Sequence, residues 1–189
     1  MNGLGAVSFT ATGLRVLARA EWPADAAPPR LAGFVHSDFN PLVAAVAGRC
    51  LEAAPAPEPE TALVLVSDLG DVDSAAHVAR AVDQGTRVGP LFFFQSVPNA
   101  VAGHVAAKWG LTGPVVCVDS TDAGLDVARL LLADGDAGEV LVVLLEHAAA
   151  PEAVTGAGHD TAAAVLLAER TAGRTAERTA ERTAERGTA

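Results

Sequence analysis

The feature that most constrains the fold is a series of short apolar runs separated by segments with helical spacing. The clearest expected strand is 139–146, where six consecutive Val and Leu residues lie between Glu139 and Glu146. Similar runs occupy 61–66 and 115–118. Apolar runs of this length, without regular polar alternation, are typical of strands buried on both faces. Strands that alternate with helices in this way predict an α/β domain with a mixed, mostly parallel sheet and helices on both faces.

Capping residues and apolar spacing predict where the elements begin and end. Asn40-Pro41 predicts a helix start with Asn40 as the N-cap, and the helix ends near Ala53, before a proline-rich stretch. We expect a first strand at Leu4–Phe9. The segment 161–169 fits either a last strand or a helix start. The remaining expected helices are 74–82, 99–109 and 121–133.

Charge and cysteine content narrow the function classes. A formal net charge of -10 would repel a phosphate backbone, so nucleic acid is not an expected partner. Cys50 and Cys117 are too few for a disulfide framework or a metal cluster, and we expect two reduced, buried side chains. No apolar run reaches the roughly 18 residues of a membrane span, and residues 1–13 lack the features of a signal peptide. A cytoplasmic protein is therefore expected.

The C-terminal segment has a different character from the rest of the chain. From Thr171 the sequence repeats a four-residue unit, Thr-Ala-Gly-Arg and then Thr-Ala-Glu-Arg three times. A four-residue repeat drifts around a helix of 3.6 residues per turn, so it presents no constant apolar face. We predict one domain over 1–170 and a frayed or disordered tail over 171–189. A partner-binding helix is the alternative for the tail.

Three aspartates, Asp68, Asp71 and Asp73, form the only carboxylate cluster that follows a predicted strand. Carboxylates at such a turn can bind Mg²⁺ or Ca²⁺, but no nucleotide-binding motif accompanies them. Capping of the following helix is the favoured interpretation. No metal and no cofactor is predicted.

Several segments, in order and at consistent spacing, resemble the N-terminal half of β-ketoacyl synthases, and in particular their chain-length-factor relatives. The most specific is VGPLFFFQSVPNAVAGHV at 88–105, continued by GLTGP at 110–114. The others are GLD at 124–126 with GDA at 135–137, and HDTAAAVLLAE at 159–169. The resemblance implies half of a thiolase-like fold.

In that family a cysteine nucleophile sits at a strand-to-helix turn that reads Cys-Ala-x-Gly. With Gly124 at the glycine position, the resemblance places Thr121 where the cysteine belongs, followed by Asp122. A threonine hydroxyl has a far higher pKa than a thiol, and Asp122 would oppose a thiolate or an oxyanion. Cys117 precedes Gly124 by seven residues instead of three. The family's two catalytic histidines belong to its second half, and His104 matches neither. No catalytic residue is therefore predicted.

The resemblance implies a catalytically deficient subunit that pairs with a full-length ketosynthase in polyketide or fatty-acid assembly, with an acyl carrier protein as a further partner. The family dimerises through the strand at 115–118. One alternative is an acyltransferase of altered chemistry that uses Thr121 or Cys117. Another is a non-enzymatic interaction module or relic, including a homodimer. The candidates for an acyl pocket or interface are Phe92, Phe93, Phe94, Gln95, Asn99, His104, Val116, Cys117, Thr121 and Asp122.

Overall fold

A computed structural model describes residues 13–23, 27–146 and 160–170. The strand expected at Leu4–Phe9 and the repeat tail at 171–189 lie outside the described residues. Within them, five strands form one mixed sheet in the order β1-β5-β4-β2-β3. The strands are β1 (Leu14–Trp22), β2 (Ala62–Val66), β3 (Val115–Val118), β4 (Glu139–Glu146) and β5 (Thr161–Glu169).

The sheet divides into a parallel and an antiparallel part. β2 pairs in parallel with both β3 and β4, whereas β5 pairs antiparallel with both β4 and β1. The sheet is therefore mixed, with two pairings of each kind. The segment 161–169 is a strand because it lies between two others, and it buries the run 164–168. β1 was not predicted, because Arg15, Arg19 and Glu21 interrupt its apolar pattern, as an edge strand permits.

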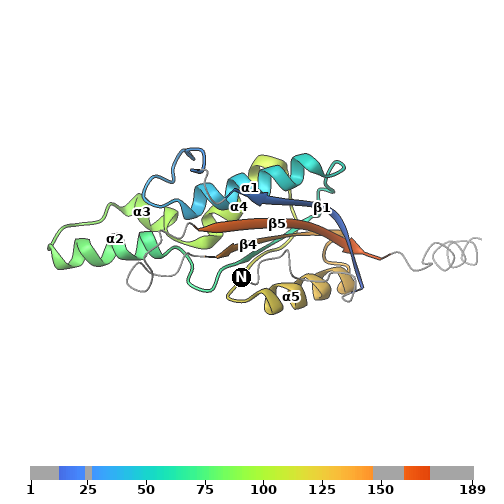
Figure 1. Cartoon of the computed structure of the whole chain (residues 1–189). Helices are drawn as coiled ribbons and strands as arrows, with labels where there is room; N and C mark the ends of the chain where they lie inside the picture. The colour runs from blue at the N-terminus through green and yellow to red at the C-terminus, as the bar shows by residue number, and fades with distance from the viewer. Residues whose placement is uncertain (1–12, 24–26, 147–159, 171–189) are drawn as a thin grey trace, which may run out of the picture.

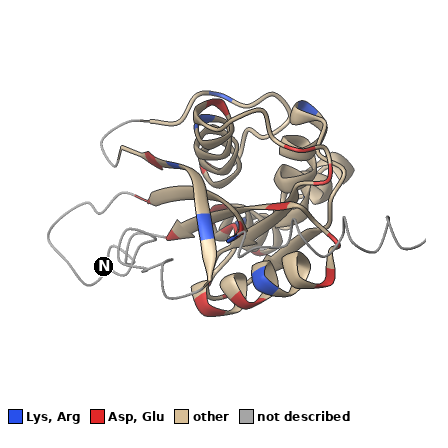
Figure 2. Ribbon diagram, turned by 90° about the vertical axis from the view of Figure 1, so that its right-hand side faces the viewer, with Lys and Arg blue, Asp and Glu red and all other residues tan. Residues whose placement is uncertain are grey.

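Helices cover both faces of the sheet, as predicted (Figure 1). α1 (Phe39–Ala53) and α4 (Pro98–Trp109) pack on one face, where Val43, Val46 and Val101 are fully buried against β2, β4 and β5. α5 (Thr121–Asp134) packs on the other face through a separate cluster that includes Leu125 and Leu132. Acidic and basic positions lie along the solvent side of α5 (Figure 2). The molecule is a three-layer α/β domain.

Two helices extend beyond the end of the sheet, at the left of Figure 1. α2 (Val72–Asp83) buries only Ser74 and Ala81, and α3 (Pro90–Gln95) buries only Phe92. No helix was predicted at the position of α3. A short helix forms there because Pro90 stands at the first helical position, where its missing N–H costs nothing.

The start of α1 differs from its prediction. Asp38 occupies the N-cap position, and Asn40 lies inside the first turn, 3% exposed. The Asn40 side chain does not cap its own helix, because it donates hydrogen bonds to Asp71 and to the backbone of Gln95 instead. A long-range contact thus replaces the expected local one.

Candidate functional site

The sharp turn between β3 and α5 places Thr121 at the start of a helix. Ser120 is the N-cap, and its hydroxyl accepts a hydrogen bond from the backbone N–H of Ala123. Thr121 is the first helical residue and is half-buried, while Asp122 is exposed in the first turn. Among the described side chains, none hydrogen-bonds to the Thr121 hydroxyl. The helix start would stabilise an anion, but its first side chain is an alcohol with no base beside it.

Gly124 lets α5 approach the sheet closely at this turn. A Cβ atom at Gly124 would lie 2.6 Å from Cγ2 of Val66 and 3.6 Å from Cγ2 of Val118. Both valines are β-branched, and Val66 is fully buried, so neither side chain can move aside easily. Close packing of α5 on the sheet therefore requires a glycine at position 124, which is the glycine position of the family's turn motif.

Cys117 lies near this turn but at the open edge of the sheet. The prediction of a buried residue is wrong for Cys117 and correct for Cys50. Cys117 is exposed because, among the described strands, β3 is the last of the sheet and has a neighbour on one side only. Its Sγ donates to Oδ1 of Asn99 in α4, at 2.7 Å. Although the residue as a whole is exposed, partial desolvation of its sulfur raises the pKa of the thiol to about 11. The thiol is therefore protonated at neutral pH and is a weak nucleophile.

The free side of β3 offers backbone groups to a further strand. The N–H groups of Leu63 and Ser67 in and after β2 donate to the carbonyls of Pro114 and Val118. Because backbone groups alternate in direction along a strand, those of Val115 and Cys117 point away from β2. Val115 is 36% exposed, Val116 is half-buried, and β3 carries no charge.

The opposite edge of the same sheet is built differently. β1 carries Arg15, Arg19 and Glu21, and its register shifts between Val16 and Ala18. Charges and bulges are the usual features that keep a strand edge from pairing with another chain. The β3 edge has neither of these features.

The three consecutive phenylalanines of α3 have different environments. Phe92 is 6% exposed and contacts the rings of His36 and His77, each with a centroid distance of 4.9 Å. Phe93 and Phe94 are exposed by 69% and 66% and contact each other edge to face. Phe92 therefore anchors α3, and its two neighbours form an apolar surface.

A buried polar network connects α1, α2 and α3. The Asp71 carboxylate accepts hydrogen bonds from the backbone N–H and hydroxyl of Ser74 and from the side-chain amide of Asn40. The same Asn40 amide donates to the backbone carbonyl of Gln95, the last residue of α3. Sequence reasoning missed this network because Asn40 lies 31 residues before Asp71 and no local pattern joins them.

The predicted capping role of Asp71 is confirmed, since its side chain caps α2. Asp68 and Asp73 are exposed. Over the described ranges, no group of three or more His, Cys, Asp or Glu side chains is arranged to hold a metal ion. His104 is half-buried in α4, where its ring packs edge to face against Phe34 at a centroid distance of 5.9 Å.

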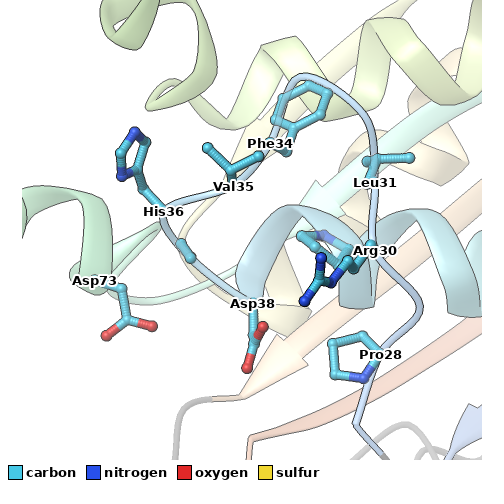
Figure 3. Close-up of a pocket in the computed structure, with 10 residues that line it drawn as sticks. Pro28, Arg30, Leu31, Phe34, Val35, His36, Asp38 and Asp73 are labelled. Carbon is cyan, nitrogen blue, oxygen red and sulfur yellow. The ribbon is translucent and has the colours of Figure 1, made fainter.

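A pocket of about 530 Å³ lies between the segment 28–38 and the starts of α1 and α2 (Figure 3). No residue of the turn between β3 and α5 lines it. Its polar lining includes Arg30, His36, Asp38 and Asp73. None of the candidates for an acyl pocket or interface lines it, and of the three aspartates considered for a cation only Asp73 does.

Comparison with known proteins assigns the family. The model of the β-ketoacyl synthase N-terminal domain matches residues 36–188. The chain belongs to this family. No curated protein matches the sequence. In the described part of the chain, no helix has the length and apolar character needed to cross a membrane.

Solved structures of ketosynthases share the fold. The ketosynthase ApeO in complex with its chain length factor ApeC from Xenorhabdus doucetiae gives a TM-score of 0.63 at 17% identity, covering 84% of this chain and 79% of that one. The ishigamide ketosynthase/chain length factor gives 0.58 at 22% identity, covering 79% and 47%. A β-ketoacyl synthase from Burkholderia phymatum STM815 gives 0.60 at 16% identity, covering 89% and 48%. The ketosynthase-like fold is thus shown, and the chain spans about half the length of the latter two.

Proposed function

We propose that this chain is a non-catalytic ketosynthase-like subunit that pairs through β3 with a catalytically complete ketosynthase, as a chain length factor does. The difference between the two sheet edges carries the proposal. The β3 edge is apolar and uncharged, and no strand of the described ranges pairs with its outer side, whereas β1 is protected by charges and a register shift. Two of the similar structures are ketosynthases with a chain length factor, and this likeness supports the same kind of partner.

The chemistry of the β3–α5 turn supports the absence of catalysis. A ketosynthase needs a thiolate at the helix start, and Thr121 supplies only a hydroxyl there. Cys117 does not replace it, because its thiol is held protonated against Asn99 at the strand edge. The alternative of acyl transfer by either residue is therefore disfavoured.

The exposed aromatic residues of α3 extend the proposed contact surface. α3 packs against α4, and α4 in turn contacts β3 through Asn99 and Cys117. Phe93 and Phe94 would bury a large apolar area against a partner. Removing apolar surface from water is favourable by about 25 cal/mol per Å². We propose that these two residues face the partner and the acyl chain that it carries.

Co-expression tests this function. The tagged chain, produced with the ketosynthase and acyl carrier protein encoded nearest to its gene, should co-purify with the ketosynthase, and its deletion should change the length of the product chain. No association, together with unchanged product length, would overturn the proposal.

Mass spectrometry separates pairing from acyl transfer. After incubation with acyl carrier protein thioesters, a covalent acyl group on Thr121 or Cys117 would show that the chain is an acyltransferase. We expect no adduct on either residue. If the chain forms a stable homodimer and does not bind the ketosynthase, that result would instead support a free-standing interaction module.

A further inference from the structure

Two buried amide oxygens in the network around Asp71 have no hydrogen-bond donor. The Oδ1 atom of Asn40 and the Oε1 atom of Gln95 are both sealed from solvent, and no described residue donates to either of them. Asn40 as a whole is 3% exposed. A buried acceptor without a donor costs free energy, so such an atom in a folded protein points to a bound water or ion.

The unpaired oxygen of Asn40 follows from the hydrogen bonds of its own amide. The Nδ2 atom donates to Oδ2 of Asp71 and to the backbone carbonyl of Gln95, both at 3.2 Å. Both partners are acceptors, so rotating the amide by half a turn would break both bonds and is excluded. The oxygen therefore faces away from these two partners, towards a group that must be a donor or a cation.

The same network carries a buried negative charge. The Asp71 carboxylate is 7% exposed and accepts hydrogen bonds from Ser74 and Asn40. Among the described residues, Asp71 forms no ion pair with a basic side chain. A positive ion beside the two amide oxygens would satisfy their lone pairs and also compensate the buried charge, whereas a water would do only the first.

We propose that the side-chain oxygens of Asn40 and Gln95, next to the Asp71 carboxylate, bind a monovalent metal cation, Na⁺ or K⁺. Hard cations take oxygen ligands, and two neutral amides beside one carboxylate offer too little negative charge for a divalent ion. Such a site differs from a group of three acidic, histidine or cysteine side chains, which the described ranges do not contain.

An ion at this position would join three helices. Asn40 lies in the first turn of α1, Asp71 caps α2, and Gln95 is the last residue of α3. The ion would therefore help to fix α3, the helix that carries the exposed rings of Phe93 and Phe94. The inference concerns the chain by itself and does not depend on the proposed pairing with a ketosynthase.

Thermal unfolding of the purified full chain in different salts tests the site. The midpoint is measured in KCl, in NaCl and in N-methylglucamine chloride, each at about 150 mM so that screening is equal. The organic cation is too large for a buried site. We expect the midpoint to be about 3 °C higher in at least one of the two metal salts than in the organic salt, because an ion that binds only the folded chain stabilises it.

The two glutamines of the chain provide a variant and its matched control. Gln95→Met replaces the amide by an apolar group of similar length, and the difference between salts should disappear. Gln84→Met changes the other glutamine, which is exposed, and should keep the difference. A crystal of the wild-type chain grown with Rb⁺ should show an anomalous peak within bonding distance of Oδ1 of Asn40.

Three outcomes would overturn the proposal. Equal midpoints in all three salts would mean that a water, or a rotated Gln95 amide, satisfies the oxygen of Asn40. A salt difference that persists in Gln95→Met would place the ion elsewhere in the molecule. Rubidium crystals without an anomalous peak beside Asn40 would contradict the site directly, even if the Gln95 variant failed to fold.

Discussion

The Sγ atom of Cys117 donates a hydrogen bond to Oδ1 of Asn99, with 2.7 Å between the two atoms. This contact joins the edge strand β3 to the first turn of α4. An amide oxygen accepts a hydrogen bond only from the protonated thiol, so this geometry and the partial desolvation of the sulfur both favour the neutral form. The one exposed cysteine of the described chain is thus a structural donor.

The reactivity of Cys117 tests this assignment. Partial desolvation of the sulfur raises its pKa from 9.0 to about 11, so the thiolate fraction at pH 8 is well below that of an unperturbed thiol. In a Cys50→Ala variant, alkylation of Cys117 by iodoacetamide, followed by mass spectrometry, should be slow at pH 7 and rise about tenfold per pH unit up to pH 9.5. The Cys117→Ser variant serves as control, since its remaining Cys50 is fully buried and should not react. Fast alkylation that levels off below pH 9 would contradict the assignment.

The close approach of α5 to the sheet predicts a strong effect at Gly124. Gly124→Ala would bring a methyl group to 2.6 Å from Val66, and such overpacking lowers the free energy of unfolding by about 1–3 kcal/mol. Gly103→Ala is the matched control in α4, because nothing lies within 4 Å of its Cβ position and alanine favours the helix. Urea denaturation should show a less stable Gly124→Ala variant and a Gly103→Ala variant at least as stable as the wild type. Equal stability of the two variants would exclude the packing explanation.

The buried amide of Asn40 predicts a second loss of stability. Asn40→Ala removes the hydrogen bonds to Asp71 and to the carbonyl of Gln95, and we expect a loss of about 1–3 kcal/mol. Asp68→Ala changes an exposed residue of the same region and should stay within about 0.5 kcal/mol of the wild type. Thermal and urea unfolding measure both. An Asn40→Ala variant as stable as Asp68→Ala would show that the network contributes nothing.

Most of the fold was predictable because its central strands are short, continuous apolar runs. β3 and β4 have the predicted limits, and α4 and α5 differ from theirs by one residue. β1 was not predicted, because an edge strand tolerates charged side chains, and the arginines of β1 interrupt the apolar run that would have indicated a strand. The helix α3 was not among the predicted helices, since six residues are too few to show a helical period.

The candidate site was predictable only where residues are neighbours in sequence. The turn from β3 into α5, with Thr121 first in the helix, follows from local pattern and from the family resemblance. The exposure of Cys117 depends on the order of strands in the sheet, which a run of apolar residues does not specify. The Asn40–Asp71 pair and the contact of His36 with His77 join distant segments, so no spacing rule could have indicated them.

The central claim is that β3 is the edge of this sheet that pairs with a ketosynthase. Two exposed valines on opposite edges allow a matched test, since Val115 in β3 is 36% exposed and Val16 in β1 is 37% exposed. Each is replaced by lysine, and the ketosynthase recovered with the tagged chain is measured by quantitative pull-down and light scattering. Val115→Lys should recover about tenfold less ketosynthase than the wild type, because pairing would bury an unpaired charge, while Val16→Lys should recover as much. Equal recovery with the two variants, or none with the wild-type chain, would contradict the account.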